Sequence, residues 1–206
     1  MSESHRARGL HGILERPAIY DWVMRALGGA AARRRFVDEF LKPHPDAKLL
    51  DAGCGTAALL DHLPPGVVYV GSDVNPAYLA SARRRYGGRG TFVLARAGDD
   101  AEVGDGFDFV VAMALLHHLD DDEVHRLLES AARRLRPGGA FVSIDPTVHP
   151  KQSRLARLLV SLDRGRRVRS PEGYRALLDA HFAHVDARVV TDLLPFPYSH
   201  YVARAR

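Results

Sequence analysis

The chain has 206 residues, of which 46% are hydrophobic and 26% are charged, a balance typical of one globular domain with a substantial core. Its only cysteine, Cys54, excludes an intrachain disulfide and argues against a structural zinc site. No segment approaches the roughly 18 apolar residues of a membrane span, and the residues after Met1 lack the apolar run of a signal peptide. We therefore expect a cytoplasmic protein with no membrane partner.

The formal net charge is +4, and all of the 29 basic residues except Lys42, Lys48 and Lys151 are arginine. Short runs of these arginines fall in predicted helices, where a solvated helix face is favoured over an acidic partner. Basicity alone therefore does not indicate a nucleic-acid partner.

Residues 1–45 are predicted to form an N-terminal helical cap. Residues 18–24 and 30–41 are the helical stretches, separated by Gly28 and Gly29. Pro43 and Pro45 end this region, because proline resists helix formation. The second predicted unit covers residues 46–206.

From Lys48 onward, short apolar runs alternate with amphipathic stretches. The predicted strands cover residues 48–52, 67–72, 91–95, 107–113 and 140–144, and the predicted helices cover residues 57–63, 76–86 and 121–135. Asp120 is placed to cap the last helix, and residues 137–139 (Pro-Gly-Gly) are expected to stop it. This alternation indicates a parallel sheet that is covered by helices on both faces.

The last part of the chain departs from that alternation. A basic helix is predicted over residues 152–162, and another helix begins after Ser170 as N-cap, with Pro171 at its first position. The extended segments 185–191 and 199–205 follow with no helix between them. We expect these two segments to form an antiparallel hairpin at one edge of the sheet.

A glycine-rich turn follows the first predicted strand, in the sequence Asp51-Ala52-Gly53-Cys54-Gly55-Thr56-Ala57. Gly53 and Gly55 allow a sharp turn and bring bare backbone close to a ligand, and the next helix offers unpaired N–H groups. A dinucleotide enzyme would use the spacing G-x-G-x-x-G and place a pyrophosphate there. The turn therefore indicates a nucleotide-like ligand, but its spacing differs from the dinucleotide pattern.

Two carboxylates near this turn narrow the class of ligand. Asp51 would repel a pyrophosphate, but it favours a ligand that carries an ammonium group, directly or through water. Asp73 ends the second predicted strand, where a carboxylate can accept hydrogen bonds from both hydroxyls of a ribose. S-adenosylmethionine carries an ammonium and a sulfonium cation and lacks phosphate, so it is the predicted cofactor.

Four segments, in this order, resemble the class I S-adenosylmethionine-dependent methyltransferases: residues 49–56, 71–76, 107–111 and 135–141. The resemblance implies an α/β, Rossmann-like, doubly wound fold with a seven-stranded, mostly parallel sheet whose last two strands form the edge hairpin. It also implies methyl transfer, with S-adenosylhomocysteine as the product.

The chain departs from the family pattern at two positions. Ala57 stands where the family usually has a third glycine, but a single added methyl group leaves cofactor binding possible. Arg96 stands where the family often has an acid that contacts the adenine amine. Asp99 or Asp100 can take that role, and we favour Asp99, although both also fit as solvated loop acids.

Further cofactor contacts are assigned to three residues outside the turn. Val74 follows Asp73, and Met113 ends the fourth predicted strand. Tyr20, in the N-terminal cap, resembles tyrosines that fold over the cofactor in relatives. With Asp51, Gly53, Gly55, Asp73 and Asp99, these complete the predicted cofactor site. We assign no metal ligands.

A candidate general base lies after the fourth strand, in Leu115-Leu116-His117-His118-Leu119-Asp120. This segment resembles one in small-molecule O-methyltransferases whose histidine deprotonates a hydroxyl, and that histidine falls on His117. The alternative is that His117 shapes the pocket or caps the next helix, and this alternative is favoured for His118. Ligands of such sheets lie beyond the carboxyl ends of the strands, so Asp145, at the end of the fifth strand, is placed to orient a substrate or to turn the loop.

The predicted function is methyl transfer to a small-molecule acceptor, with oxygen as the favoured nucleophile. Residues 147–170 are the expected acceptor-side insertion, and its arginines at 164–169 either hold an acidic acceptor or form a solvated loop. The alternatives are an RNA methyltransferase and a non-catalytic module that binds S-adenosylmethionine. A nucleic-acid acceptor is disfavoured, because residues 112–115 lack the Asn/Asp-Pro-Pro-aromatic tetrad of base-amine methyltransferases. The sequence does not indicate an oligomeric state.

Overall fold

A computed structural model describes residues 28–99, 101–161 and 167–206. Several predicted features lie outside these described residues. They are the helix over residues 18–24, which contains Tyr20, and the single residues Asp100, Arg164 and Arg166. No helix in the described part of the chain is long and apolar enough to cross a membrane.

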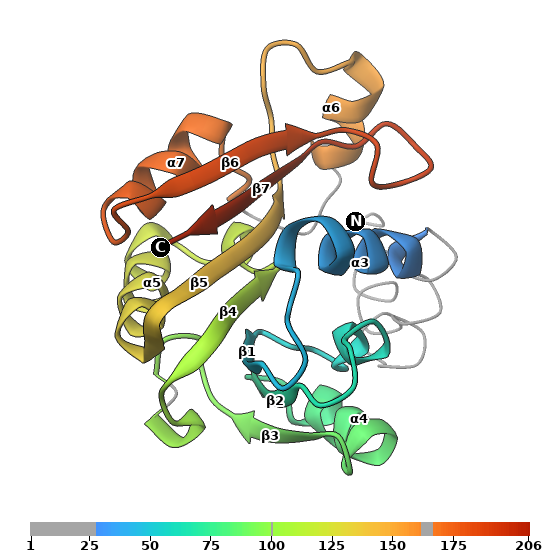
Figure 1. Ribbon diagram of the computed structural model, residues 1–206. Helices are drawn as coiled ribbons and strands as arrows, with labels where there is room; N and C mark the ends of the chain where they lie inside the picture. Colours follow the sequence, from blue (N-terminus) through green and yellow to red (C-terminus); the bar gives the residue numbers. More distant parts are fainter. Residues whose placement is uncertain (1–27, 100, 162–166) are drawn as a thin grey trace, which may run out of the picture.

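A single seven-stranded sheet organises the described residues (Figure 1), in the order β3-β2-β1-β4-β5-β7-β6. Strands β1 to β5 pair in parallel, whereas β7 runs antiparallel between β5 and β6. The fold and its edge hairpin are therefore as predicted. The strands are β1 (Lys48–Ala52), β2 (Val68–Asp73), β3 (Gly90–Leu94), β4 (Phe107–Met113), β5 (Leu135–Pro146), β6 (Val185–Val190) and β7 (His200–Ala205).

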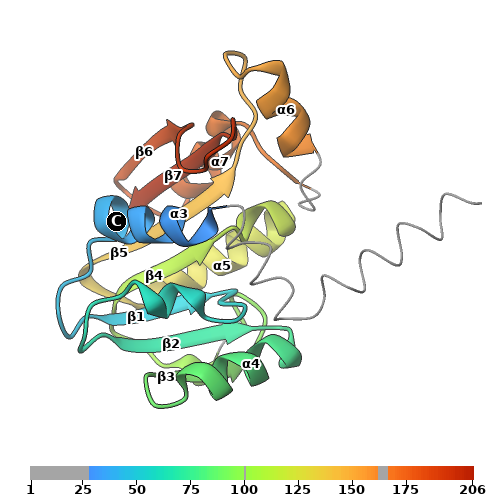
Figure 2. The same ribbon diagram turned by 90° about the vertical axis from the view of Figure 1, so that its right-hand side faces the viewer.

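Helices flank the sheet, and one of them, α6, projects beyond it (Figures 1 and 2). The helices are α3 (Gly29–Phe36), α4 (Pro76–Tyr86), α5 (Asp121–Arg134), α6 (Arg154–Ser161) and α7 (Pro171–Asp179). Shorter turns are the π-helical η1 (Val37–Leu41) and the 3-10 turns η2 (Ala58–Asp61), η3 (Ala101–Val103) and η4 (Leu116–His118).

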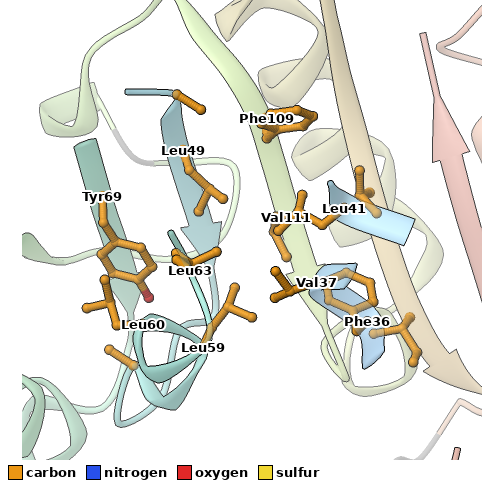
Figure 3. Packing of buried hydrophobic residues seen from close by; sticks show 14 of the residues in the cluster. Phe36, Val37, Leu41, Leu49, Leu59, Leu60, Leu63, Tyr69, Phe109 and Val111 are labelled. Atoms are coloured by element: carbon orange, nitrogen blue, oxygen red, sulfur yellow. The ribbon is translucent and has the colours of Figure 1, made fainter. Parts of the chain in front are cut away.

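Two hydrophobic clusters cover the two faces of the sheet, because successive side chains of a strand point to opposite faces. In β1, Leu49 belongs to the cluster under α3, η1, η2 and α4, whereas Leu50 belongs to the cluster under α5 and α7. Figure 3 shows Phe36, Val37 and Leu41 packed beside Phe109 and Val111 in the first cluster. The segment that contains α3 and η1 therefore shares the core of the sheet.

Capping residues fix where two of the predicted helices begin. Asp120 accepts a hydrogen bond from the Glu123 amide, and the Glu123 side chain accepts one from the Asp120 amide, which forms a capping box at the start of α5. Ser170 accepts a hydrogen bond from the Gly173 amide at the start of α7. Both N-caps are the ones predicted.

Two predicted boundaries are wrong. The helix over residues 57–63 is only the four-residue turn η2, because Ala57 has a left-handed backbone (φ 58) and prolines follow at positions 64 and 65. The helix over residues 121–135 ends at Arg134, and β5 begins at once at Leu135 instead of at residue 140. Leu135 pairs with Phe107, and an irregularity in the β4–β5 register accommodates the glycines.

Candidate active site

The glycine turn is a tight loop held at the carboxyl end of the sheet. Gly53, Gly55 and Ala57 all have positive φ values, of 70, 55 and 58°. The Cys54 amide donates to the carbonyl of Ser72 at 2.9 Å, so the turn is attached to the end of β2. A Cβ added to Gly55 would meet no atom within 4 Å, and the backbone there is open to a ligand.

Asp73 connects the turn to the loop after β2. Its Oδ2 accepts a hydrogen bond from the Gly55 amide, and its Oδ1 accepts one from the Asn75 amide, each at 2.8 Å. An ionised carboxylate has about four acceptor positions, so the two remaining ones can accept the hydroxyls of a ribose. Asp73 thus contacts the glycine turn directly, and its role at a ribose stays a prediction.

Asp51 is a buried acid beneath the turn, with a relative exposure of 3%. Burial raises the pKa of Asp51 to about 7, and the nearby charge of Asp73 also raises it. The Tyr69 hydroxyl donates a hydrogen bond to Asp51 Oδ2 at 2.7 Å, and this contact lowers the pKa. A cation placed next to Asp51 would favour its ionised form. This environment fits the ammonium group of S-adenosylmethionine.

The prediction from sequence missed Tyr69 as the partner of Asp51. Tyr69 and Gly71 lie on the same face of β2, because they are two residues apart, and Gly71 stands opposite Asp51 in the sheet. A Cβ on Gly71 would come within 3.0 Å of the Tyr69 ring and 2.8 Å of Cys54 Sγ. Gly71, a glycine inside a strand, was therefore the one sequence signal that a neighbouring side chain occupies the space beside it.

His117 and Asp145 form a buried pair after β4 and β5. Asp145 Oδ1 lies 2.8 Å from Nδ1 of the His117 ring and accepts the His117 amide at 3.1 Å. The two side chains are 3% and 1% exposed. Burial raises the pKa of Asp145, and the contacts with His117 oppose that rise. Asp145 therefore orients the histidine, whereas the sequence left open whether Asp145 orients a substrate or turns the loop.

Leu115 brings this pair close to the glycine turn. A Cβ built on Gly53 would meet Leu115 Cδ1 at 2.8 Å, so the loop that carries His117 packs directly on the turn. His118 has an exposed side chain, with its ring centroid 4.0 Å from that of His117. The His117 ring is thus buried against a carboxylate, whereas the His118 side chain is exposed.

Three other residues of the predicted cofactor site lie in the described part of the chain. Val74 is 63% exposed next to Asp73. Met113 is partly buried at the end of β4 and precedes Ala114, which has a left-handed backbone. Asp99 is exposed, and its amide donates to the Arg96 carbonyl in the same loop. Their assignments, and that of Tyr20, stay predictions.

Within the predicted arginine cluster, Arg167 and Arg169 differ sharply. The Arg167 side chain is exposed. The Arg169 side chain is only 11% exposed, and its guanidinium donates to the carbonyls of Leu116 and Leu119 and pairs with Asp121. Sequence analysis missed this role, because nothing local to Arg169 indicates that its partners lie about fifty residues earlier.

A family described as a methyltransferase domain matches residues 49–139, from β1 into β5. The chain is 35% identical over 111 residues to a human protein named thiol S-methyltransferase TMT1A (51% of this chain, 45% of the relative). It is 35% identical over 141 residues to a demethylmenaquinone methyltransferase of Thermus thermophilus (64% and 63%). It is also 32% identical over 102 residues to a ubiquinone biosynthesis O-methyltransferase of Sinorhizobium medicae (48% and 40%).

Residues 49–139 match a methyltransferase domain and the three relatives are named methyltransferases, so these comparisons support the predicted resemblance to the class I S-adenosylmethionine-dependent methyltransferases. Its fold is similar to that of the pyocyanin biosynthetic protein PhzM, with a TM-score of 0.70, 21% identity, and coverage of 89% of this chain and 56% of that one. The chain spans 40% to 63% of the length of the three relatives in sequence. The methyltransferase match includes the glycine turn, Asp73 and His117, but ends before Asp145.

The residues of this site fit the family's cofactor. The backbone at Gly55 is open, Asp73 has acceptor positions to spare, and Asp51 is a buried carboxyl that a nearby cation would ionise. Among the described residues, no group of three histidine, cysteine, aspartate or glutamate side chains is arranged to hold a metal ion.

Proposed function

We propose that this methyltransferase transfers a methyl group from S-adenosylmethionine to an oxygen atom of a small molecule. The observation that carries the proposal is the buried His117–Asp145 pair, whose loop packs through Leu115 on the glycine turn. A base positioned beside the cofactor turn is what an acceptor hydroxyl requires. We further propose that residues 147–170 form the acceptor side of the site.

The bound cofactor supplies a methyl group on a positively charged sulfur, which is already a good leaving group. The chain's own residues then have to hold the acceptor in line and keep water away, and orientation of this kind can contribute up to about 7–11 kcal/mol in well-aligned systems. Asp51, Asp73 and the turn hold one reactant, and His117 meets the other.

His117 is suited to remove the proton of the acceptor. With Nδ1 protonated and donating to Asp145 Oδ1 at 2.8 Å, Nε2 carries the lone pair. The His117 side chain is 3% exposed, so bulk water has little access to the ring. With S-adenosylmethionine and an acceptor bound, Nε2 would take the proton of the acceptor hydroxyl as that oxygen receives the methyl group.

The choice of oxygen rests on the need for this base. A phenol has a pKa near 10 and a thiol near 8.5, so a thiol is partly ionised at neutral pH without help. The human relative is named as a thiol S-methyltransferase and the Sinorhizobium relative as an O-methyltransferase. The test therefore compares oxygen and sulfur as methyl acceptors.

The test is transfer of labelled methyl from S-adenosylmethionine to a panel of paired phenols and thiols and to extracts of the host, analysed by mass spectrometry. We expect a phenolic product, and we expect His117→Ala to lower turnover by about 10²–10⁴-fold with S-adenosylhomocysteine affinity retained. His184→Ala, at an exposed histidine just before β6, is the control and should keep its turnover.

Three outcomes would contradict the proposal. Full turnover in His117→Ala would exclude His117 as the base. Labelled thiols without labelled phenols would exclude oxygen specificity. Cofactor binding without transfer to any fraction would instead indicate a non-catalytic module.

A further inference from the structure

The loop that carries His117 is held from two sides. On one side, Asp145 at the end of β5 accepts both the amide and Nδ1 of His117. On the other side lies the segment just before α7, whose Arg167 amide donates to the His117 carbonyl at 3.1 Å. The loop therefore depends on residues that follow it in the chain by many positions.

Arg169 makes the larger part of the second set of contacts. Its Nη1 donates to the Leu116 carbonyl at 2.8 Å, and its Nη2 donates to the Leu119 carbonyl at 2.9 Å. Leu116 and Leu119 flank the two histidines, so one guanidinium spans the turn that carries His117. The same group pairs with Asp121 in the first turn of α5, at 2.6 Å from Nη2 and 3.0 Å from Nε.

Arg169 is itself anchored in the predicted acceptor-side segment. Its carbonyl accepts the Thr147 hydroxyl at 2.9 Å, its guanidinium lies 5.8 Å from the centroid of the Tyr174 ring, and its neighbour Ser170 caps α7. The side chain is 11% exposed. An arginine held at both ends transmits the position of this segment to the loop.

We propose that Arg169 is a positioning residue that keeps the His117 ring on Asp145. The inference rests on the proposed role of His117 as the base. A planar guanidinium with several N–H donors can reach two carbonyls and a carboxylate together, whereas a lysine ammonium cannot reproduce this fork. Without it, the carbonyls of Leu116 and Leu119 lose a charged donor and the loop is released on one side.

The test reads the histidine ring directly, so it does not require a known acceptor. In the full chain labelled with ¹⁵N, the Nδ1 proton of His117 should give a separate NMR signal, because the buried contact with Asp145 slows its exchange with water. His117→Asn identifies that signal by its loss. We expect Arg169→Gln to broaden or shift it and to increase its exchange rate with water by tenfold or more.

Arg167→Gln is the matched control. Arg167 lies two positions before Arg169 and its side chain is exposed, so the substitution removes the same charge and keeps the backbone N–H that the His117 carbonyl accepts. It should leave the signal unchanged. Arg169→Lys should not restore the signal, since the fork is lost. Asp121→Asn, which removes the carboxylate contact but not the carbonyl contacts, should have a smaller effect than Arg169→Gln.

The readings have distinct meanings. A His117 signal that is unchanged in Arg169→Gln, or in Arg169→Lys if the first variant does not fold, overturns the inference whether or not the protein transfers methyl groups. With a phenol from the panel above, the same variants should lose about tenfold or more in kcat while S-adenosylhomocysteine affinity stays constant; a loss confined to KM would also overturn the positioning role.

Discussion

At the scale of single residues, we expect the ionisation of Asp51 to set how cofactor binding responds to pH. Its pKa of about 7, raised by burial against the hydrogen bond from Tyr69, makes it neutral in acid and ionised in mild base. The ionised form attracts a cation and the neutral form does not. Cofactor affinity should therefore increase as pH rises through about 7 and should level off above it.

The expected change is up to about tenfold between pH 8 and pH 6, since one unit below the pKa only about a tenth of the carboxyl is ionised. Calorimetric titration of S-adenosylhomocysteine across this range measures it. Asp51→Asn should remove the dependence, and Tyr69→Phe should move its midpoint upward, because the hydrogen bond that lowers the pKa of Asp51 is lost. A flat profile in the wild-type protein would contradict the role of Asp51.

Asp73 is the second residue whose contribution to cofactor affinity can be measured by substitution. Asp73→Ala should weaken S-adenosylhomocysteine binding at least about tenfold, because hydrogen bonds to a charged group contribute roughly 1.5–3 kcal/mol. Part of that loss comes from the loop, since both oxygens also hold backbone amides. Asp186→Ala, an exposed aspartate on β6, is the control. Equal affinities in the two variants would rule out the ribose assignment.

At the scale of elements, a substitution in the glycine turn is expected to change the stability of the fold and the affinity for the cofactor to different extents. Gly55 has φ 55, close to the φ 58 that Ala57 already tolerates, and an added Cβ at Gly55 would enter open space. Gly55→Ala should therefore cost only about 1 kcal/mol of folding free energy. Its affinity for S-adenosylhomocysteine should fall more than tenfold, because the methyl group occupies the space that the ligand needs.

Urea unfolding and calorimetry measure these two effects independently. Ala57→Gly is a useful comparison: it relieves a left-handed alanine but removes a fully buried methyl group, and we expect a stability within about 1 kcal/mol of wild type. Retained affinity in Gly55→Ala would mean that the cofactor does not approach the backbone at this position.

The elements themselves were largely predictable, because their signals are local. The β1 and β4 boundaries and the caps of α5 and α7 follow from apolar runs and from Asp120, Ser170 and Pro171. The failures, at η2 and at the start of β5, come from backbone conformations and strand pairing that residue type does not specify.

At the scale of the whole molecule, we expect S-adenosylhomocysteine, and not a dinucleotide, to stabilise the fold against thermal unfolding. S-adenosylhomocysteine at 100 times its Kd should add about 2.7 kcal/mol, which corresponds to a rise in Tm of about 5–10 °C for a protein of this size. NAD⁺ should give no shift, because its pyrophosphate would lie near Asp51. Thermal unfolding followed by circular dichroism measures both, and stabilisation by NAD⁺ alone would contradict the cofactor assignment.

The sequence by itself determined the α/β class, the edge hairpin, the glycine turn and the positions of Asp51 and Asp73 near strand ends. These depend on periodicity and on residues adjacent to strand ends, so short stretches of chain contain them. Only the tertiary structure decided the partners of the functional groups. Asp145 reaches His117 across 28 positions and Arg169 reaches Leu116 across 53, because neighbouring strands and the segment before α7 bring their ends together, and no local pattern records such contacts.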